Sequence, residues 1–136
     1  MRRRGRSHRA ERREAEIAYL KAHGVWLVIS VMRTRHNIAD YERAGLEWHH
    51  VPVASAAAGA DALEELLPML RRDLRRSGAV AVHGDRDTDF VAALCAASLH
   101  EWRGTDPAKS LTAAGAAGLT VTPAACALVG VEKVAA

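Results

Sequence analysis

The chain has 136 residues and a formal net charge of +3, so we expect one compact domain. No apolar run approaches the roughly 18–20 residues of a membrane span, and the N-terminus lacks the apolar segment of a secretory signal. Its two cysteines, Cys95 and Cys126, form no CxxC pair, which excludes a disulfide framework and a zinc ribbon. We therefore expect a cytoplasmic location, no membrane contact, and cysteines that serve as buried small apolar residues.

Positive charge is concentrated at the N-terminus, where residues 1–14 hold seven arginines against two glutamates. The arginines are Arg2, Arg3, Arg4, Arg6, Arg9, Arg12 and Arg13. Residues 1–8 are expected to form a basic disordered arm before a single domain over residues 9–136. The arm could neutralise several phosphates of a nucleic acid or another polyanion, although no interleaved aromatic residue would stack on bases. A solvated extension without a ligand is the alternative.

The first half of the chain alternates between helical and extended patterns. Apolar spacing predicts a helix over residues 9–23, and the β-branched run 25–32 is typical of a strand buried on both faces. A short helix over residues 38–44, with Asn37 as its cap, precedes a second strand over residues 46–53.

The second half continues this alternation after a loop of small residues. Asp61 is expected to cap a helix that reaches Gly78, in which Pro68 should produce a kink or lie on the outer face. A third strand over residues 79–83 leads into the polar loop 84–89. Helices are then predicted over residues 90–102, 106–117 and 123–134. The order predicts an α/β fold with a small, mostly parallel central sheet flanked by helices.

Several sequence blocks resemble the dual-specificity protein phosphatases in their order and spacing. These blocks are Gly24-Val25, Val28-Ile29-Ser30, the run from Tyr41 to Val53 (YERAGLEWHHVPV), and Val80-Ala81-Val82-His83 before a loop and an apolar helix. The resemblance covers roughly residues 14–117 and implies that family's fold. Rhodanese-like domains share a similar strand, loop and helix, but the block from Tyr41 to Val53 favours the phosphatases.

The catalytic loop of that family reads His-Cys-x-x-Gly-x-x-Arg followed by Ser or Thr. Its Cys is the nucleophile and its Arg grips the phosphoryl oxygens. If His83 matches the family's histidine, Gly84 replaces the nucleophile and Phe90 replaces the arginine. Asp87 then replaces the loop glycine and Val91 replaces the hydroxyl residue. The resemblance implies that His83 orients the loop through hydrogen bonds.

The general acid of the family, an Asp shortly after the second strand, is also missing, because Asp61 is the first acidic residue there. Three lost groups predict a catalytically inactive relative with a binding or regulatory role and an unidentified protein partner. The degenerate phosphate loop comprises His83, Gly84, Asp85, Arg86, Asp87, Thr88, Asp89 and Phe90. No catalytic residue, cofactor or metal site is predicted.

Two other functions remain open from the sequence. Carboxylates can act as nucleophiles or metal ligands, so Asp85 or Asp87 could serve a phosphoester hydrolase with a rebuilt loop. The spacing of three aspartates resembles the start of an EF-hand loop, but Ala96 occupies the position of its bidentate acid. Acidic residues that favour the dipole of the next helix are the simpler interpretation. A nucleic-acid-associated protein acting through its basic arm is the other alternative.

Overall fold

The computed structural model describes residues 8–35, 37–76, 78–85 and 88–132. Its strands are β1 (Val25–Ser30), β2 (Glu47–His50) and β3 (Ala79–His83). Its helices are α1 (His8–Ala22), α2 (Ile38–Arg43), α3 (Ala60–Asp73), α4 (Phe90–Arg103), α5 (Pro107–Ala116) and α6 (Pro123–Leu128), with the short 3-10 helix η1 (Ala56–Ala58). None of the helices in these residues is long and apolar enough to cross a membrane.

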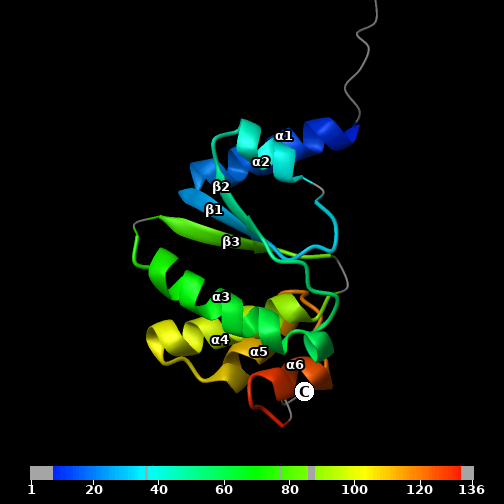
Figure 1. The fold of residues 1–136 in the computed structure, drawn as a ribbon, viewed down its shortest axis with the longest axis vertical. Helices are drawn as coiled ribbons and strands as arrows, with labels where there is room; N and C mark the ends of the chain where they lie inside the picture. Colours follow the sequence, from blue (N-terminus) through cyan, green and yellow to red (C-terminus); the bar gives the residue numbers. More distant parts are fainter. Residues whose placement is uncertain (1–7, 36, 77, 86–87, 133–136) are drawn as a thin grey trace, which may run out of the picture.

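The strands form one sheet with the order β2-β1-β3, and both pairings are parallel. In the centre, Ile29 pairs with His49 on one side and with Val82 on the other. Helices lie above and below the sheet (Figure 1). The predicted small parallel sheet flanked by helices is therefore confirmed, and the β-branched run forms its covered central strand.

One face of the sheet is covered by α1 and α2, which lie next to each other in Figure 1. Their contact with the sheet is a small apolar cluster, whose buried members are Ile17, Val28, Ile38, Tyr41 and Leu46. Tyr41 is the one member with a polar end, and it carries its hydroxyl toward the end of β3.

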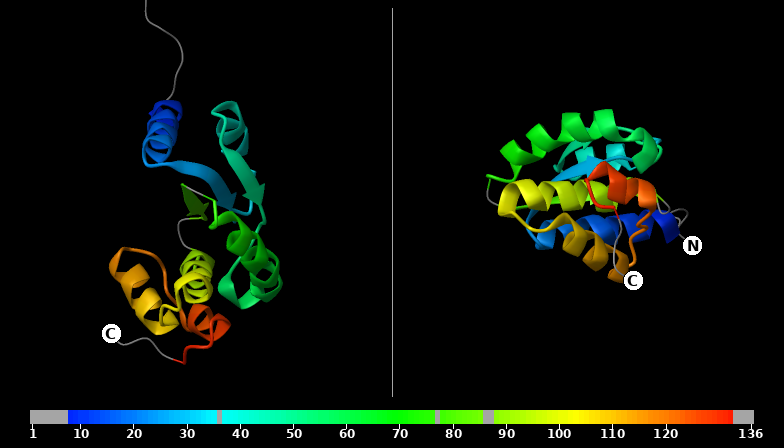
Figure 2. Two further views of the ribbon diagram at one scale, coloured as in Figure 1. Left: turned by 90° about the vertical axis from the view of Figure 1, so that its left-hand side faces the viewer. Right: turned by 90° about the horizontal axis from the view of Figure 1, so that it is seen from below.

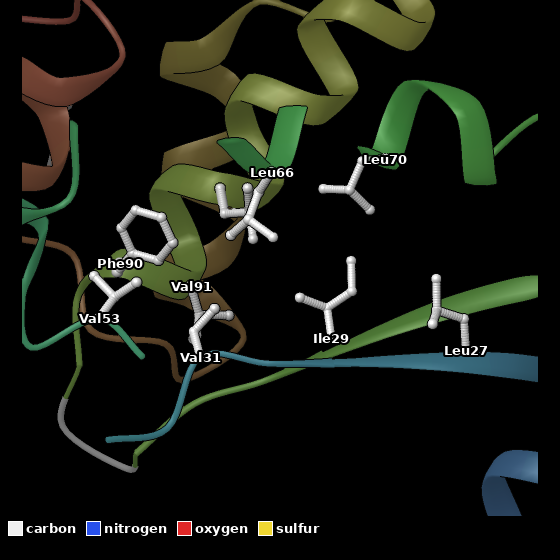
Figure 3. Packing of buried hydrophobic residues seen from close by; sticks show 9 residues of the cluster. Leu27, Ile29, Val31, Val53, Leu66, Leu70, Phe90 and Val91 are labelled. Atoms are coloured by element: carbon white, nitrogen blue, oxygen red, sulfur yellow. The ribbon is translucent and has the colours of Figure 1, made fainter. Parts of the chain in front are cut away.

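The other face holds the larger core, shown in Figure 3. Leu27 and Ile29 of β1, and Val31 directly after it, point toward α3 and α4. Leu66 of α3 and Phe90 at the start of α4 meet them there. Because Phe90 belongs to this core, the loop before it is fixed directly to the packing of the domain.

Of the two predicted helix caps, Asn37 does occupy the N-cap position of α2, whereas Asp61 does not cap α3. Asn37 has a left-handed backbone, with φ of 75°, and its side chain makes no cap hydrogen bond. The chain enters α3 through Gly59, whose carbonyl accepts from the N–H of Leu63 at 2.9 Å. Asp61 instead lies exposed in the first turn of α3, where its charge favours the helix dipole.

Other boundaries differ from the predictions at helix ends. Helix α3 ends at Asp73, before the predicted end near Gly78, and Pro68 lies inside it on an exposed position. Helix α6 ends at Leu128, because Gly130 adopts a positive φ of 77° and reverses the chain. Cys126 is buried as predicted, whereas Cys95 is half-buried.

Candidate functional site

The candidate site is the loop between the carboxyl end of β3 and the start of α4. The structure describes six of its eight predicted positions, and Arg86 and Asp87 lie outside the described residues. The loop leaves the sheet beside β1, because the N–H of Val31 donates to the carbonyl of His83 at 2.8 Å. This is the place where the phosphatase resemblance predicts a phosphate loop.

His83 at the end of β3 is held by a tyrosine from the opposite helix layer. The Tyr41 hydroxyl lies 3.0 Å from Nδ1 of His83. Burial raises the pKa of Tyr41, so the hydroxyl keeps its proton. Tyr41 is thus a contact of the His83 ring that the sequence did not reveal.

Gly84, at the expected nucleophile position, has no room for a side chain. A β-carbon there would lie 2.6 Å from Cγ2 of Val91 and 2.8 Å from Cγ2 of Thr88. A third methyl carbon, Cγ2 of Val31, would be 3.2 Å away. Valine and threonine are β-branched, so their side chains have restricted χ1 angles. They cannot easily rotate away to make room for an added group. The pocket that a cysteine side chain would need is filled by methyl groups.

Asp85 is tied to the segment that follows β1. Its Oδ2 accepts from the backbone N–H of Arg33 at 3.2 Å and from Nε of the same residue at 3.4 Å. Its carbonyl accepts from the N–H of Thr88 at 3.0 Å. The Asp85 carboxylate is therefore paired with the side chain of Arg33.

At the start of α4, a backbone N–H is bonded to a side chain of the protein. In a phosphate loop, such an N–H group would be free to bind the phosphate. The N–H of Phe90 donates to Oγ1 of Thr88 at 3.4 Å. Thr88 is itself buried. Anion sites at helix N-termini depend on such free N–H groups, so this bond reduces what an anion could use.

Asp89 points into the protein and joins three segments. It is buried, and its Oδ1 accepts from the N–H of Ala56 in η1 at 2.7 Å. Its Oδ2 accepts from the hydroxyl of Thr122, which also caps α6 by accepting from the N–H of Ala125 at 3.1 Å. Burial raises the pKa of Asp89, but these hydrogen bonds outweigh burial and leave the pKa below its ordinary value. Asp89 is a structural anion.

Phe90, at the expected position of the phosphate-gripping arginine, is fully buried. Its ring lies between Val53 and Leu66 in Figure 3. Gly59 permits this position, because a β-carbon there would approach Cδ1 of Phe90 to 2.5 Å. Phe90, at the expected position of the arginine, is thus a core residue, and its side chain does not reach the surface of the loop.

Two of the predicted polyanion contacts, Arg12 and Arg13, line a groove that also reaches His83 at the start of the loop. Within residues 8–35, 37–76, 78–85 and 88–132, no group of three His, Cys, Asp or Glu side chains is placed to hold a metal ion. Arg2, Arg3, Arg4 and Arg6 lie outside the described residues, as does the side chain of Arg9. Arg13 contacts Asp40 at 3.1 Å, and Arg12 lines a groove beside β3.

Sequence reasoning missed the residues that hold the loop in place. Tyr41, Arg33, Gly59 and Thr122 each contact it from a distant part of the chain. Of these four residues, only Tyr41 lies in a recognisable sequence pattern, because it is the first residue of the phosphatase-like block. The other three have no local pattern that would mark them.

No family model and no curated protein matches the sequence. Solved phosphatase structures do match. Human DUSP28 is 24% identical with a TM-score of 0.69, covering 82% of this chain and 79% of that chain. P. aeruginosa TpbA is 18% identical with a TM-score of 0.69, covering 87% of this chain and 74% of that chain.

A third structure is the human tyrosine phosphatase-like serine/threonine/tyrosine-interacting protein. It is 14% identical with a TM-score of 0.68, and the match covers 88% of this chain and 83% of that chain. The chain therefore has the fold of the dual-specificity and tyrosine phosphatases, and the fold that the resemblance implied is confirmed.

Proposed function

We propose that this chain is a pseudophosphatase domain, a catalytically inactive phosphatase-like scaffold that acts by binding a protein partner. The observation that carries the proposal is the filled space at Gly84, where three methyl groups occupy the place of a nucleophile's side chain. Cysteine-dependent phosphoryl transfer needs that side chain as a thiolate, a cation on the phosphoryl oxygens, and a general acid.

The cationic clamp has been replaced by a core residue. Phe90 is fully buried, and a phenyl ring offers no hydrogen-bond donor to a phosphoryl oxygen. The segment between Val53 and Asp61 contains no acidic residue that could protonate a leaving group. All three catalytic roles are thus without a residue at the matched positions.

The charges at the loop also disfavour a phosphate ligand. Asp85 holds the nearby Arg33, so that cation is already paired. A carboxylate about 4–6 Å from a phosphate would oppose its binding by about 1 kcal/mol or more at surface dielectric. The ionised Asp89 adds negative charge behind the loop.

A hydrolase that uses the loop carboxylates is less well supported. Asp85 accepts two hydrogen bonds from Arg33, and Asp89 is buried under hydrogen bonds from η1 and Thr122. Asp85 therefore has one carboxylate oxygen held by Arg33, whereas both oxygens of Asp89 are engaged inside the protein. Asp87, the other carboxylate considered for this role, lies outside the described residues. Nucleic-acid binding through the N-terminal arginines stays a separate prediction.

A protein-binding role fits the two loops that the sequence singled out. The hydrogen bond from Ala56 to Asp89 fixes loop 54–60 against loop 84–89. Together they form one surface, which we propose as the partner contact. The similarity to a phosphatase-like interacting protein supports a role of this kind.

The proposal is tested by turnover of p-nitrophenyl phosphate between pH 5 and 8, with and without Mg²⁺. We expect no turnover above a heat-denatured sample, and the same result for Asp85→Ala. Turnover by the parent chain that Asp85→Ala abolishes would establish a carboxylate-dependent hydrolase and overturn the proposal. Turnover that survives this substitution would place a catalytic site elsewhere and would overturn it equally.

A further inference from the structure

The carboxyl-terminal ends of α3 and α4 lie together at the end of the molecule away from the candidate site (Figure 1). Figure 2, left, looks onto this end, where α3 lies next to α4. Arg71 in the last turn of α3 donates to both carboxylate oxygens of Glu101 in α4, at 2.9 and 3.0 Å. Both helices begin beside the candidate loops, and α3 has 14 residues, so its two ends are roughly 20 Å apart. The surface at this end is therefore separate from the loop surface proposed above.

A hollow of about 220 Å³ opens between the two helices at this end. Leu67 and Leu70 of α3, and Leu74 directly after it, line one side of the hollow. Pockets for drug-sized ligands usually measure roughly 300–1,000 Å³, so this hollow has room for one large side chain rather than for a cofactor. A nucleobase would leave its polar edge groups without partners against leucine, so the lining favours an apolar side chain.

Trp102 of α4 lines the hollow from the other side and is 47% exposed. Arg103 lies over its ring, with the guanidinium carbon 4.3 Å from the ring centroid. Tryptophan and arginine are enriched among the few residues that supply most of the binding energy of protein interfaces. An exposed indole beside leucine side chains, with a guanidinium on one of its faces, is therefore suited to bury an apolar side chain of a partner.

The surface around the hollow carries more positive than negative charge. The segment RRDLRR at the end of α3 has four arginines and one acidic residue, Asp73, which is buried. The carboxylate that lines the hollow, that of Glu101, is paired with Arg71. Arg75 and Arg103 are exposed, and within the described residues neither forms an ion pair. A partner that complements this surface therefore carries negative charge.

An acidic peptide complements this surface better than a nucleic acid does. Nucleic-acid binding gains its affinity from neutralising many phosphates, and the unpaired guanidinium groups of Arg75 and Arg103 could neutralise only a few. Carboxylates form short, charge-assisted hydrogen bonds with arginine, so two of them are enough to position a peptide on these residues. The leucine-lined hollow then holds an apolar side chain between them.

We propose that an acidic segment of a partner protein binds at the carboxyl-terminal ends of α3 and α4. One large apolar side chain of the segment enters the hollow, where it packs on Trp102 and on Leu67 and Leu74. Carboxylates on either side of it pair with Arg75 and Arg103. This is a second contact surface, and it depends neither on the candidate loops nor on whether the chain is catalytically inactive.

Fluorescence anisotropy of labelled synthetic peptides tests the proposal. The probes are capped nonapeptides of the sequence GEEDXDEEG, in which X is leucine, phenylalanine or alanine. We expect saturable binding of the leucine or the phenylalanine peptide, and binding at least tenfold weaker for the alanine peptide, because alanine leaves the hollow unfilled. The peptide GQQNLNQQG keeps the leucine but has no carboxylates, so it should also bind at least tenfold more weakly than its acidic counterpart.

Variants of the protein locate the binding surface. Trp102→Ala should weaken binding of the tighter acidic peptide at least tenfold, whereas Tyr19→Ala, which removes an exposed aromatic ring from α1, should leave it unchanged. Arg75→Glu should weaken binding at least fivefold, because it reverses the charge that faces the peptide. Arg43→Glu is the matched charge reversal on α2, across the sheet, and should leave binding unchanged. Circular dichroism confirms that each variant is folded.

The proposal is overturned if neither the leucine nor the phenylalanine peptide binds saturably up to millimolar concentration. Binding that Trp102→Ala and Arg75→Glu leave unchanged would also overturn it, because the contact would then lie on another surface. Labelled oligothymidylate is the last probe. If it binds and Trp102→Ala weakens that binding, while the acidic peptides do not bind, the surface recognises single-stranded nucleic acid and the proposal is wrong.

Discussion

Gly84 is the residue on which the proposal of a catalytically inactive domain rests most directly. Three methyl groups of neighbouring residues occupy the space that a side chain at this position would need, so the packing around it suits only glycine. A single replacement therefore cannot restore a nucleophile without moving Val91 and Thr88.

We predict that Gly84→Cys lowers the free energy of unfolding by roughly 1–3 kcal/mol, the usual cost of overpacking. It should also give no turnover of an aryl phosphate, since the buried Phe90 stands at the matched position of the arginine that grips the phosphoryl oxygens. Urea unfolding and the turnover assay measure the two effects. A stable Gly84→Cys variant with turnover would show that the site is open and only lacks its thiol.

Asp89 gives the loop a pH-dependent anchor. Its pKa is lowered in the folded protein, so its contribution to stability is present above the unfolded value near about 4 and is lost as the pH falls through the folded value. We predict that the unfolding free energy decreases below about pH 4 and that Asp89→Asn removes part of this decrease. The substitution should itself cost roughly 1–3 kcal/mol at neutral pH.

Urea unfolding between pH 3 and 7 measures this dependence. Asp61→Asn is the control, because Asp61 is exposed in the first turn of α3. It should keep the pH dependence of the parent chain. An identical pH profile for Asp89→Asn and the parent would contradict the structural role of Asp89.

At the scale of elements, the start of α4 is held by packing against the segment before α3. Gly59 and Phe90 are in direct contact, and that contact fixes loop 54–60 beside loop 84–89. This contact fixes the start of α4 by packing. The loop is held by apolar burial and by Asp89.

We predict that Gly59→Ala destabilises the domain by roughly 1–3 kcal/mol, because the new β-carbon would lie 2.5 Å from the ring of Phe90. Gly115→Ala in α5 is the matched control. Its β-carbon would lie 3.7 Å from Val121, an ordinary contact, and alanine should stabilise the helix by roughly 0.5–1 kcal/mol. Thermal unfolding compares the two variants, and equal shifts would contradict the packing argument.

The elements with strong local patterns could be predicted from the sequence. The apolar run of β1, the AVAV strand and the helix after it all lie close to their predicted bounds, because their side chains report burial directly. The position of the Asn37 cap could be predicted, but its lack of a side-chain hydrogen bond could not, and the cap at Asp61 was wrong, because cap geometry depends on φ and on one hydrogen bond. The partners of the loop could not be predicted, since Arg33, Gly59 and Thr122 reach it through the tertiary fold.

At the scale of the whole molecule, the chain has the phosphatase fold, and the proposed inactivity rests on three features of the described part of the loop. Methyl groups surround Gly84, the phenyl ring of Phe90 is buried, and the hydroxyl group of Thr88 accepts from the N–H of Phe90. On the proposal, these features take away space, a cationic side chain and a hydrogen-bond donor that a phosphoryl group would use.

The most direct test of this account is an NMR titration of the ¹⁵N-labelled chain with inorganic phosphate, matched in ionic strength by sodium chloride. The signals to follow are those of the backbone N–H groups of Gly84 and Phe90. These groups would face the phosphate if the loop bound one. We predict no saturable shift of either signal beyond that caused by the salt. Saturable shifts of both signals at one common dissociation constant would show that the loop binds phosphate and would contradict the account.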